Sequence, residues 1–87
     1  MRALNIYEKA VGNIPLEIRK ETALSFSVSD KIHSLLKTGG MTQKEFARRM
    51  GKTESEVSVW LSGQHNFTLR TLARISAVLG EDVVSVT

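Results

Sequence analysis

The chain has 87 residues, a net charge of +3 and 41% hydrophobic residues, which fits one small domain with a single core. It contains no cysteine, which excludes a disulfide scaffold or thiolate metal site and fits a reducing compartment. The charged N-terminus is unlike a signal peptide, and no apolar run approaches the ~20 residues that cross a bilayer, so we expect a cytoplasmic protein with no membrane partner. No segment is strongly basic, so charge alone does not identify a nucleic-acid binder.

The first forty residues predict an arm followed by one helix. Residues 1–13 show weak periodicity and are expected to form an arm. Pro15 suits the first turn of a helix, where its missing N–H is not needed. Apolar residues then recur at helical spacing to about Lys37, before the Gly39-Gly40 pair ends the element: Leu24, Val28, Ile32, Leu35 and Leu36.

A possible interruption lies inside this helix. Ser27-x-x-Asp30 has the form of a capping box and is consistent with a break or a fresh start. We therefore divide the chain into residues 1–28, an N-terminal arm and helical extension, and residues 29–87, the main domain.

Three shorter helices are expected after residue 40. Thr42-x-x-Glu45 and Thr53-x-x-Glu56 are capping boxes, so both glutamates are assigned to caps, and Thr68 suits the start of a third helix. Three glycines are placed to close these helices: Gly51, Gly63 and Gly80.

The C-terminal residues predict a short β-strand, because Val83, Val84 and Val86 are β-branched. A lone strand has no partner strand in its own chain. It is expected either to pair with a second copy or to lie against the helices.

The most informative stretch is residues 42–63, where two short helices flank a tight turn. Ala47 is small enough for the second helix to cross the first closely, and Gly51 supplies the positive φ of a short turn. Val57 supplies the apolar contact at the crossing. Each residue is common alone, but the combination between two capping boxes is a strong signal.

The second of these helices has two contrasting faces. Val57, Trp60 and Leu61 form the stripe expected to be buried. The opposite face carries short, uncharged side chains: Ser55, Ser58, Val59 and Ser62. Hydroxyls can bond base edges or phosphates, and a valine can contact a thymine methyl group. The alternative interpretation is a low-charge surface helix with no binding role.

This segment resembles the XRE family of Cro-type helix-turn-helix repressors over residues 32–86. The resemblance rests on residues 41–47, Gly51, Val57-Ser58, residues 61–63, Leu72 and Ile75. It implies an all-α, five-helix, lambda-repressor-like domain, here with an N-terminal helical extension and a short C-terminal β-strand. It also implies a homodimer that binds a palindromic operator in double-stranded DNA.

Residues 58–80 are also similar to HigA-like antitoxins, in which a helical N-terminal extension often accompanies the domain. This second resemblance implies an alternative function. The protein would neutralise a partner toxin through its N-terminal segment and autoregulate its operon, and the two roles can coexist.

The resemblance to the XRE family implies particular DNA contacts. Gln43 matches a glutamine that contacts phosphate and nearby bases, beside the free N–H groups of a helix start. The usual recognition positions are Thr53, Glu54, Ser55, Ser58 and Val59. Val59 departs from the long polar residue common there. Glu54 brings negative charge, which a cytosine amine or the helix dipole can offset.

Further contacts are predicted around this core of the site. They comprise Thr42, Lys44, Lys52, Ser62, Gln64, His65, Asn66, Thr68 and Arg70. Each has a structural alternative, because charged side chains usually form a solvated face and either Asn66 or Thr68 can cap the following helix. His33 is expected at the surface, and the large aromatic residues in the core.

Enzymatic activity is the weakest hypothesis. The chain has two isolated histidines, no cysteine and no glycine-rich phosphate loop, so no catalytic constellation is visible. We expect no catalytic residue, no metal and no cofactor.

Overall fold

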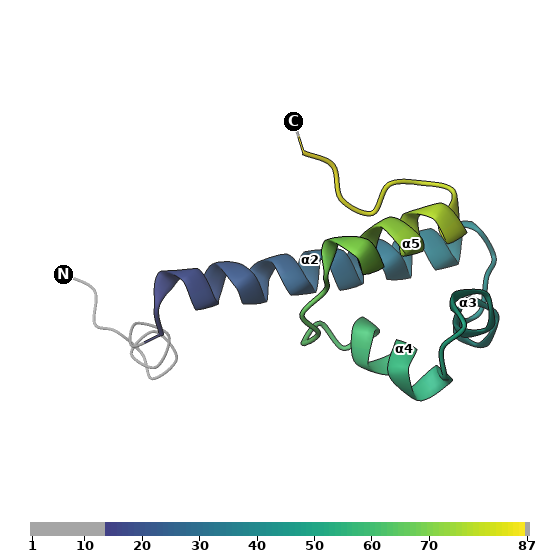
Figure 1. Cartoon of the computed structure of the whole chain (residues 1–87), viewed down its shortest axis with the longest axis horizontal. Helices are drawn as coiled ribbons and strands as arrows, with labels where there is room; N and C mark the ends of the chain where they lie inside the picture. The colour runs from purple at the N-terminus through teal and green to yellow at the C-terminus, as the bar shows by residue number, and fades with distance from the viewer. Residues whose placement is uncertain (1–13, 87) are drawn as a thin grey trace.

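The computed structural model describes residues 14–86 as an all-α arrangement (Figure 1). Four helices lie in this range: α2 (Leu16–Thr38), α3 (Gln43–Met50), α4 (Glu54–Leu61) and α5 (Leu69–Leu79). The long helix α2 runs along the molecule, α4 packs against its C-terminal half, and α3 packs against both α4 and α5. The arm expected at residues 1–13 lies outside the described residues.

Helix α2 is continuous, so a break or fresh start at Ser27 is wrong. Its 23 residues pass through Ser27 and Asp30 without interruption. The physical reason is the buried stripe that begins at Val28 and Ser29 and continues through Ile32, because a break there would disrupt this face. Pro15 stands one position earlier than expected, as the N-cap, with φ −53° and ψ 144°.

The expectation of five helices is also wrong, since residues 14–86 form four. The extension and the first helix of the expected domain are one element, α2. The boundary that we placed after residue 28 therefore falls inside this helix. Thus the extension continues directly into the segment that packs against α4.

The expected C-terminal strand is absent from the described residues. Val83 is 7% exposed and belongs to the hydrophobic core, and its backbone N–H donates to Ser76 Oγ at 3.1 Å. Val84 and Val86 are exposed. This part of the chain lies against the helices because the Val83 side chain packs in the core and the Val83 N–H donates to a side chain of α5.

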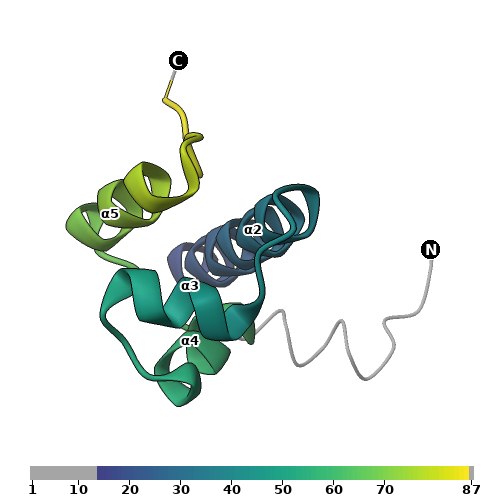
Figure 2. The same cartoon turned by 90° about the vertical axis from the view of Figure 1, so that its right-hand side faces the viewer.

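The core lies where α2, α3, α4 and α5 meet (Figure 2). Ile32, Phe46, Val57 and Ile75 are fully buried there. Trp60 is 5% exposed, and its ring meets Phe46 in an edge-to-face arrangement at 6.3 Å. Phe67 is partly buried against this cluster. As expected, these three aromatic side chains belong to the core or pack against it.

No helix within residues 14–86 combines the length and apolar character needed to span a membrane.

Candidate nucleic-acid interface

The turn between α3 and α4 depends on Gly51. This residue has φ 68° and ψ 33°, the left-handed conformation that glycine adopts without strain. Its N–H donates to Arg48 O at 3.1 Å, and Lys52 N–H donates to Ala47 O at 2.9 Å. This pair of bonds is a Schellman motif, which ends α3 and turns the chain towards α4 within two residues. The predicted role of Gly51 is confirmed.

A complete capping box begins α4. Thr53 Oγ1 accepts from the Glu56 N–H at 3.1 Å, and Glu56 Oε2 accepts from the Thr53 N–H at 2.8 Å. The Thr53 N–H bond lowers the pKa of the Glu56 carboxyl group. The predicted cap is therefore confirmed, and both side chains are engaged in holding the first turn.

Helix α2 holds the other end of α4. The last carbonyl groups of a helix lack partners within the helix, and here side chains of α2 supply them. Ser29, 2% exposed, donates from Oγ to Trp60 O at 2.5 Å, and His33 Nε2 lies 3.3 Å from Leu61 O. Sequence reasoning missed both contacts, because a serine and a histidine 28 or more residues away carry no local signal.

The exposed side of α4 carries the short side chains. Val57, Trp60 and Leu61 are buried, whereas Val59 is 53% exposed. The exposed set is the one that the helical wheel places outward: Ser55, Ser58, Val59 and Ser62. Ser62 has an additional task, since its Oγ donates to Val59 O at 2.6 Å and accepts from Gln64 N–H at 3.3 Å. The outer face of α4 is thus narrow, uncharged and open to solvent.

Several predicted contact residues also serve as caps. Thr42 Oγ1 accepts from the Glu45 N–H, and Thr68 Oγ1 accepts from the Thr71 N–H, both at 3.1 Å. Of the two alternatives for the cap of α5, the structure therefore has Thr68. The remaining flanking side chains stay exposed, apart from a half-buried His65: Gln43, Lys44, Lys52, Glu54, Gln64, Asn66 and Arg70.

The structure brings most of these residues to one end of the molecule. Residues 42–44 begin α3, and residues 52–62 form the adjoining turn and α4. Arg70 is less closely tied to them. It lies in the first turn of α5, and residues 14–86 show no hydrogen bond or ion pair joining it to α4.

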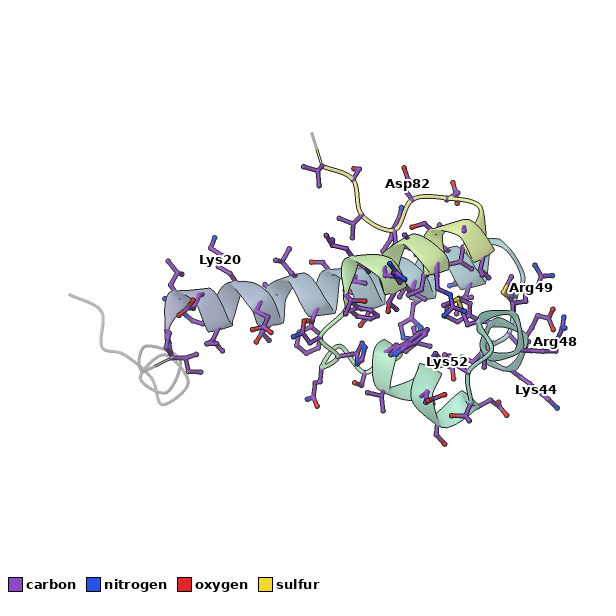
Figure 3. All side chains as sticks on the ribbon, viewed as in Figure 1. Lys20, Lys44, Arg48, Arg49, Lys52 and Asp82 are labelled. Atoms are coloured by element: carbon purple, nitrogen blue, oxygen red, sulfur yellow. The ribbon has the colours of Figure 1, made fainter. Side chains whose placement is uncertain are left out.

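The capping box expected at Thr42 is only half formed. Glu45 instead receives Arg48 Nη2 at 2.6 Å and Arg49 Nε at 2.9 Å, because charged donors compete well against a backbone N–H. These bonds lower the Glu45 pKa to about 2. Arg48 and Arg49 are therefore both paired with Glu45 on α3 (Figure 3). Lys44 and Lys52, in contrast, form no ion pair within residues 14–86.

Two short helices at a tight glycine turn, the second with a free polar face, define a helix-turn-helix motif. The family described as helix-turn-helix matches residues 32–85, more than half of the chain. The chain belongs to this family, of the XRE type, and is a DNA-binding protein of the transcription-regulator class rather than of a catalytic one. Searches of curated proteins and of solved structures returned no match.

Proposed function

We propose that this protein is a transcriptional repressor that binds a palindromic operator as a homodimer. The observation that carries the proposal is the outer face of α4, where Ser55, Ser58 and Val59 are exposed and uncharged. A B-DNA major groove about 12 Å wide admits a helix with such short side chains. Residues 54–62 would lie in the groove, with hydroxyls and one methyl-bearing side chain against base edges.

The residues around α4 would fix its register on the duplex. Gln43 begins α3, where unpaired backbone N–H groups favour a phosphate. Lys44 and Lys52 would add salt-dependent attraction to the backbone. Glu54 is the first residue of α4 and would accept a hydrogen bond from a cytosine amine. Because phosphates repel its carboxylate, Glu54 would contact a base and not the DNA backbone.

Selection of bound duplexes from a random pool, followed by footprinting, tests this proposal. We expect a two-fold symmetric site with half-sites about one helical turn, roughly 34–36 Å, apart. A reporter whose promoter overlaps that site should lose expression when the protein is present. Failure to enrich any sequence, or a single asymmetric half-site, contradicts the proposal.

A second candidate function is that of an antitoxin that neutralises a partner protein. An apolar groove of about 620 Å³ supports it, because the groove lies away from the outer face of α4. It runs between the extension half of α2, the start of α5 and the C-terminal residues. Its apolar lining is formed by Leu16, Leu24, Val28, Phe67, Leu72 and Val84. Leu24 is 67% exposed, which leaves apolar surface to cover.

Co-purification with the product of the adjoining reading frame tests this second function. The L16E/L24E variant should lose the complex because it places charge in the groove, whereas S58E should keep it. Retention of the complex by L16E/L24E, or absence of any complex with the wild type, contradicts the antitoxin function.

A further inference from the structure

A second pocket, of about 350 Å³, opens beside α4, and charged and polar side chains share its lining with Val59 and Trp60. The turn before α4 contributes Lys52, the helix itself contributes Glu56 and Val59, and α5 contributes Thr71 and Arg74. Because Val59 also belongs to the exposed face of α4, the pocket adjoins the surface that we propose enters the major groove. It is therefore placed to contact whatever lies against that face.

Neither cation of this pocket forms an ion pair within residues 14–86, although the Lys52 charge adds to the Thr53 N–H bond in lowering the pKa of Glu56. Arg74 is oriented by α3, since its Nη2 donates to Met50 O at 2.9 Å. That bond uses one of the five guanidinium donors. Glu56 is the one acidic residue of the lining, and its carboxylate is engaged by Thr53 at the cap of α4. Positive charge and free donors therefore predominate.

Neutral donors complete the pocket. Thr71 Oγ1 accepts from the Thr68 hydroxyl at 2.9 Å, which leaves its own proton to donate. His65 also lines the pocket, with its ring edge-to-face against Phe67 at 4.8 Å and 6.0 Å from the Trp60 ring. These aromatic contacts position the imidazole. An ammonium, a guanidinium, a hydroxyl and an imidazole around one hollow form a donor set suited to a phosphate oxyanion.

We propose that this pocket binds a phosphate group, supplied by the backbone of the DNA that α4 reads. This inference rests on the proposed function for the source of the phosphate, and it adds Thr71 and Arg74 to the residues that contact the duplex. Such a contact positions α4 and carries no sequence information. Its loss weakens operator and non-operator binding equally.

Binding of the full chain to a duplex, measured by anisotropy over a range of salt concentrations, tests the proposal. K52Q and R74Q should each reduce the slope of log K against log salt by about 0.9, as expected for one lost phosphate contact. The matched controls K20Q and R19Q make the same charge changes on the extension half of α2, away from α4, and should leave the slope unchanged. Because Arg74 also bonds Met50 O, T71V provides a variant without that role, and it should weaken binding without changing specificity.

Titration of inorganic phosphate against Trp60 fluorescence, without DNA, distinguishes the two sources of phosphate. Trp60 is the one tryptophan of the chain and lines the pocket. A saturable change that K52Q and R74Q abolish, with unchanged duplex slopes, assigns the pocket to free phosphate. Unchanged slopes without such a change overturn the proposal. If the wild type binds no duplex, the proposed function fails, and the fluorescence arm still decides whether the pocket holds phosphate.

Discussion

Single residues on the outer side of α4 define how closely a duplex can approach the helix backbone. Ser55 and Ser58 present only a hydroxyl beyond the Cβ atom, and Val59 presents two methyl groups. None carries a charge that would require desolvation on binding. The chemistry of this face is therefore limited to short hydrogen bonds and one apolar contact, and its fit depends on the exact rotation of α4.

Replacing Ser58 with glutamate tests that dependence. S58E should abolish operator binding, by at least about 100-fold, because a carboxylate would then face the phosphates and base acceptors of the groove. The fold should persist, since position 58 is exposed and glutamate is a good helix former. Anisotropy titration and circular dichroism measure the two effects. S27E, which adds the same charge on the extension of α2, is the control and should bind normally.

Gly63 tests the close approach of α2 to the residues that follow α4. It has φ 86°, and a Cβ atom added there would collide with the ring of Phe26. G63A should lower the free energy of unfolding by about 2 kcal/mol, through the backbone conformation and the displaced ring. G40A, with φ 66° and open space around it, should cost only about 1 kcal/mol. Equal losses in denaturant titrations would exclude the contribution of Phe26.

At the scale of the helices, both ends of α4 are fixed by polar side chains. Thr53 and Glu56 hold the first turn, and Ser29 and His33 from α2 meet the last carbonyl groups. An eight-residue helix is unstable alone, so these bonds and its buried stripe determine its orientation. Helix α2 thereby helps to fix the orientation of the outer face of α4.

The Ser29 bond gives a direct measure of that support. S29A should lower the free energy of unfolding by about 1–2 kcal/mol, because the partner carbonyl of Trp60 would lose its buried donor. S27A, two residues earlier on the exposed side of α2, should change stability by less than about 0.5 kcal/mol. Chemical denaturation of both variants provides the comparison. A loss for S29A no larger than for S27A would mean that this bond does not support α4.

Glu45 makes the stability of α3 depend on pH. Its pKa is about 2 in the folded chain, against an ordinary value of 4.5, chiefly because Arg48 and then Arg49 donate to it. A lowered folded pKa contributes stability that is present above about pH 4.5 and is lost as the pH falls towards 2. The Tm difference between wild type and E45Q should therefore be largest near pH 6 and vanish near pH 2. A pH-independent difference for E45Q would contradict this cause.

Local features of the helices were predictable from sequence, whereas contacts between distant segments were not. The caps at Thr53 and Thr68 and the turn at Gly51 follow from residue types that act on their immediate neighbours. The continuity of α2 through Ser27 was not predicted. The Ser27-x-x-Asp30 pattern stabilises a helix start only slightly, whereas a break there would interrupt the buried face of α2. The C-terminal valines were misassigned because β propensity did not reveal that Val83 would reach the core.

The candidate site was predictable to a similar extent. The helical wheel of α4 correctly separated its buried side chains from its exposed ones, because the helical period depends only on sequence spacing. The pairing of Glu45 with two arginines was not anticipated, since Glu45 can serve either its cap or a cation. Arg74 was overlooked because its approach to Met50 O depends on how α5 packs against α3.

At the scale of the whole molecule, the two candidate binding surfaces lie apart. The outer face of α4 and the start of α3 occupy one end of the molecule, whereas the extension half of α2 projects away from the α3–α4 pair (Figure 1). Apolar surface on that extension, including Leu16 and Leu24, is available for a second protein chain. A duplex bound at the outer face of α4 would therefore leave Leu16 and Leu24 uncovered.

Amide chemical-shift mapping of the ¹⁵N-labelled full chain during titration with its selected duplex tests the central claim most directly. The account predicts that the largest changes fall on Gln43, Ser55, Ser58 and Val59, while residues 16–26 of α2 change little. The largest changes on residues 16–26, with α4 unaffected, would contradict it.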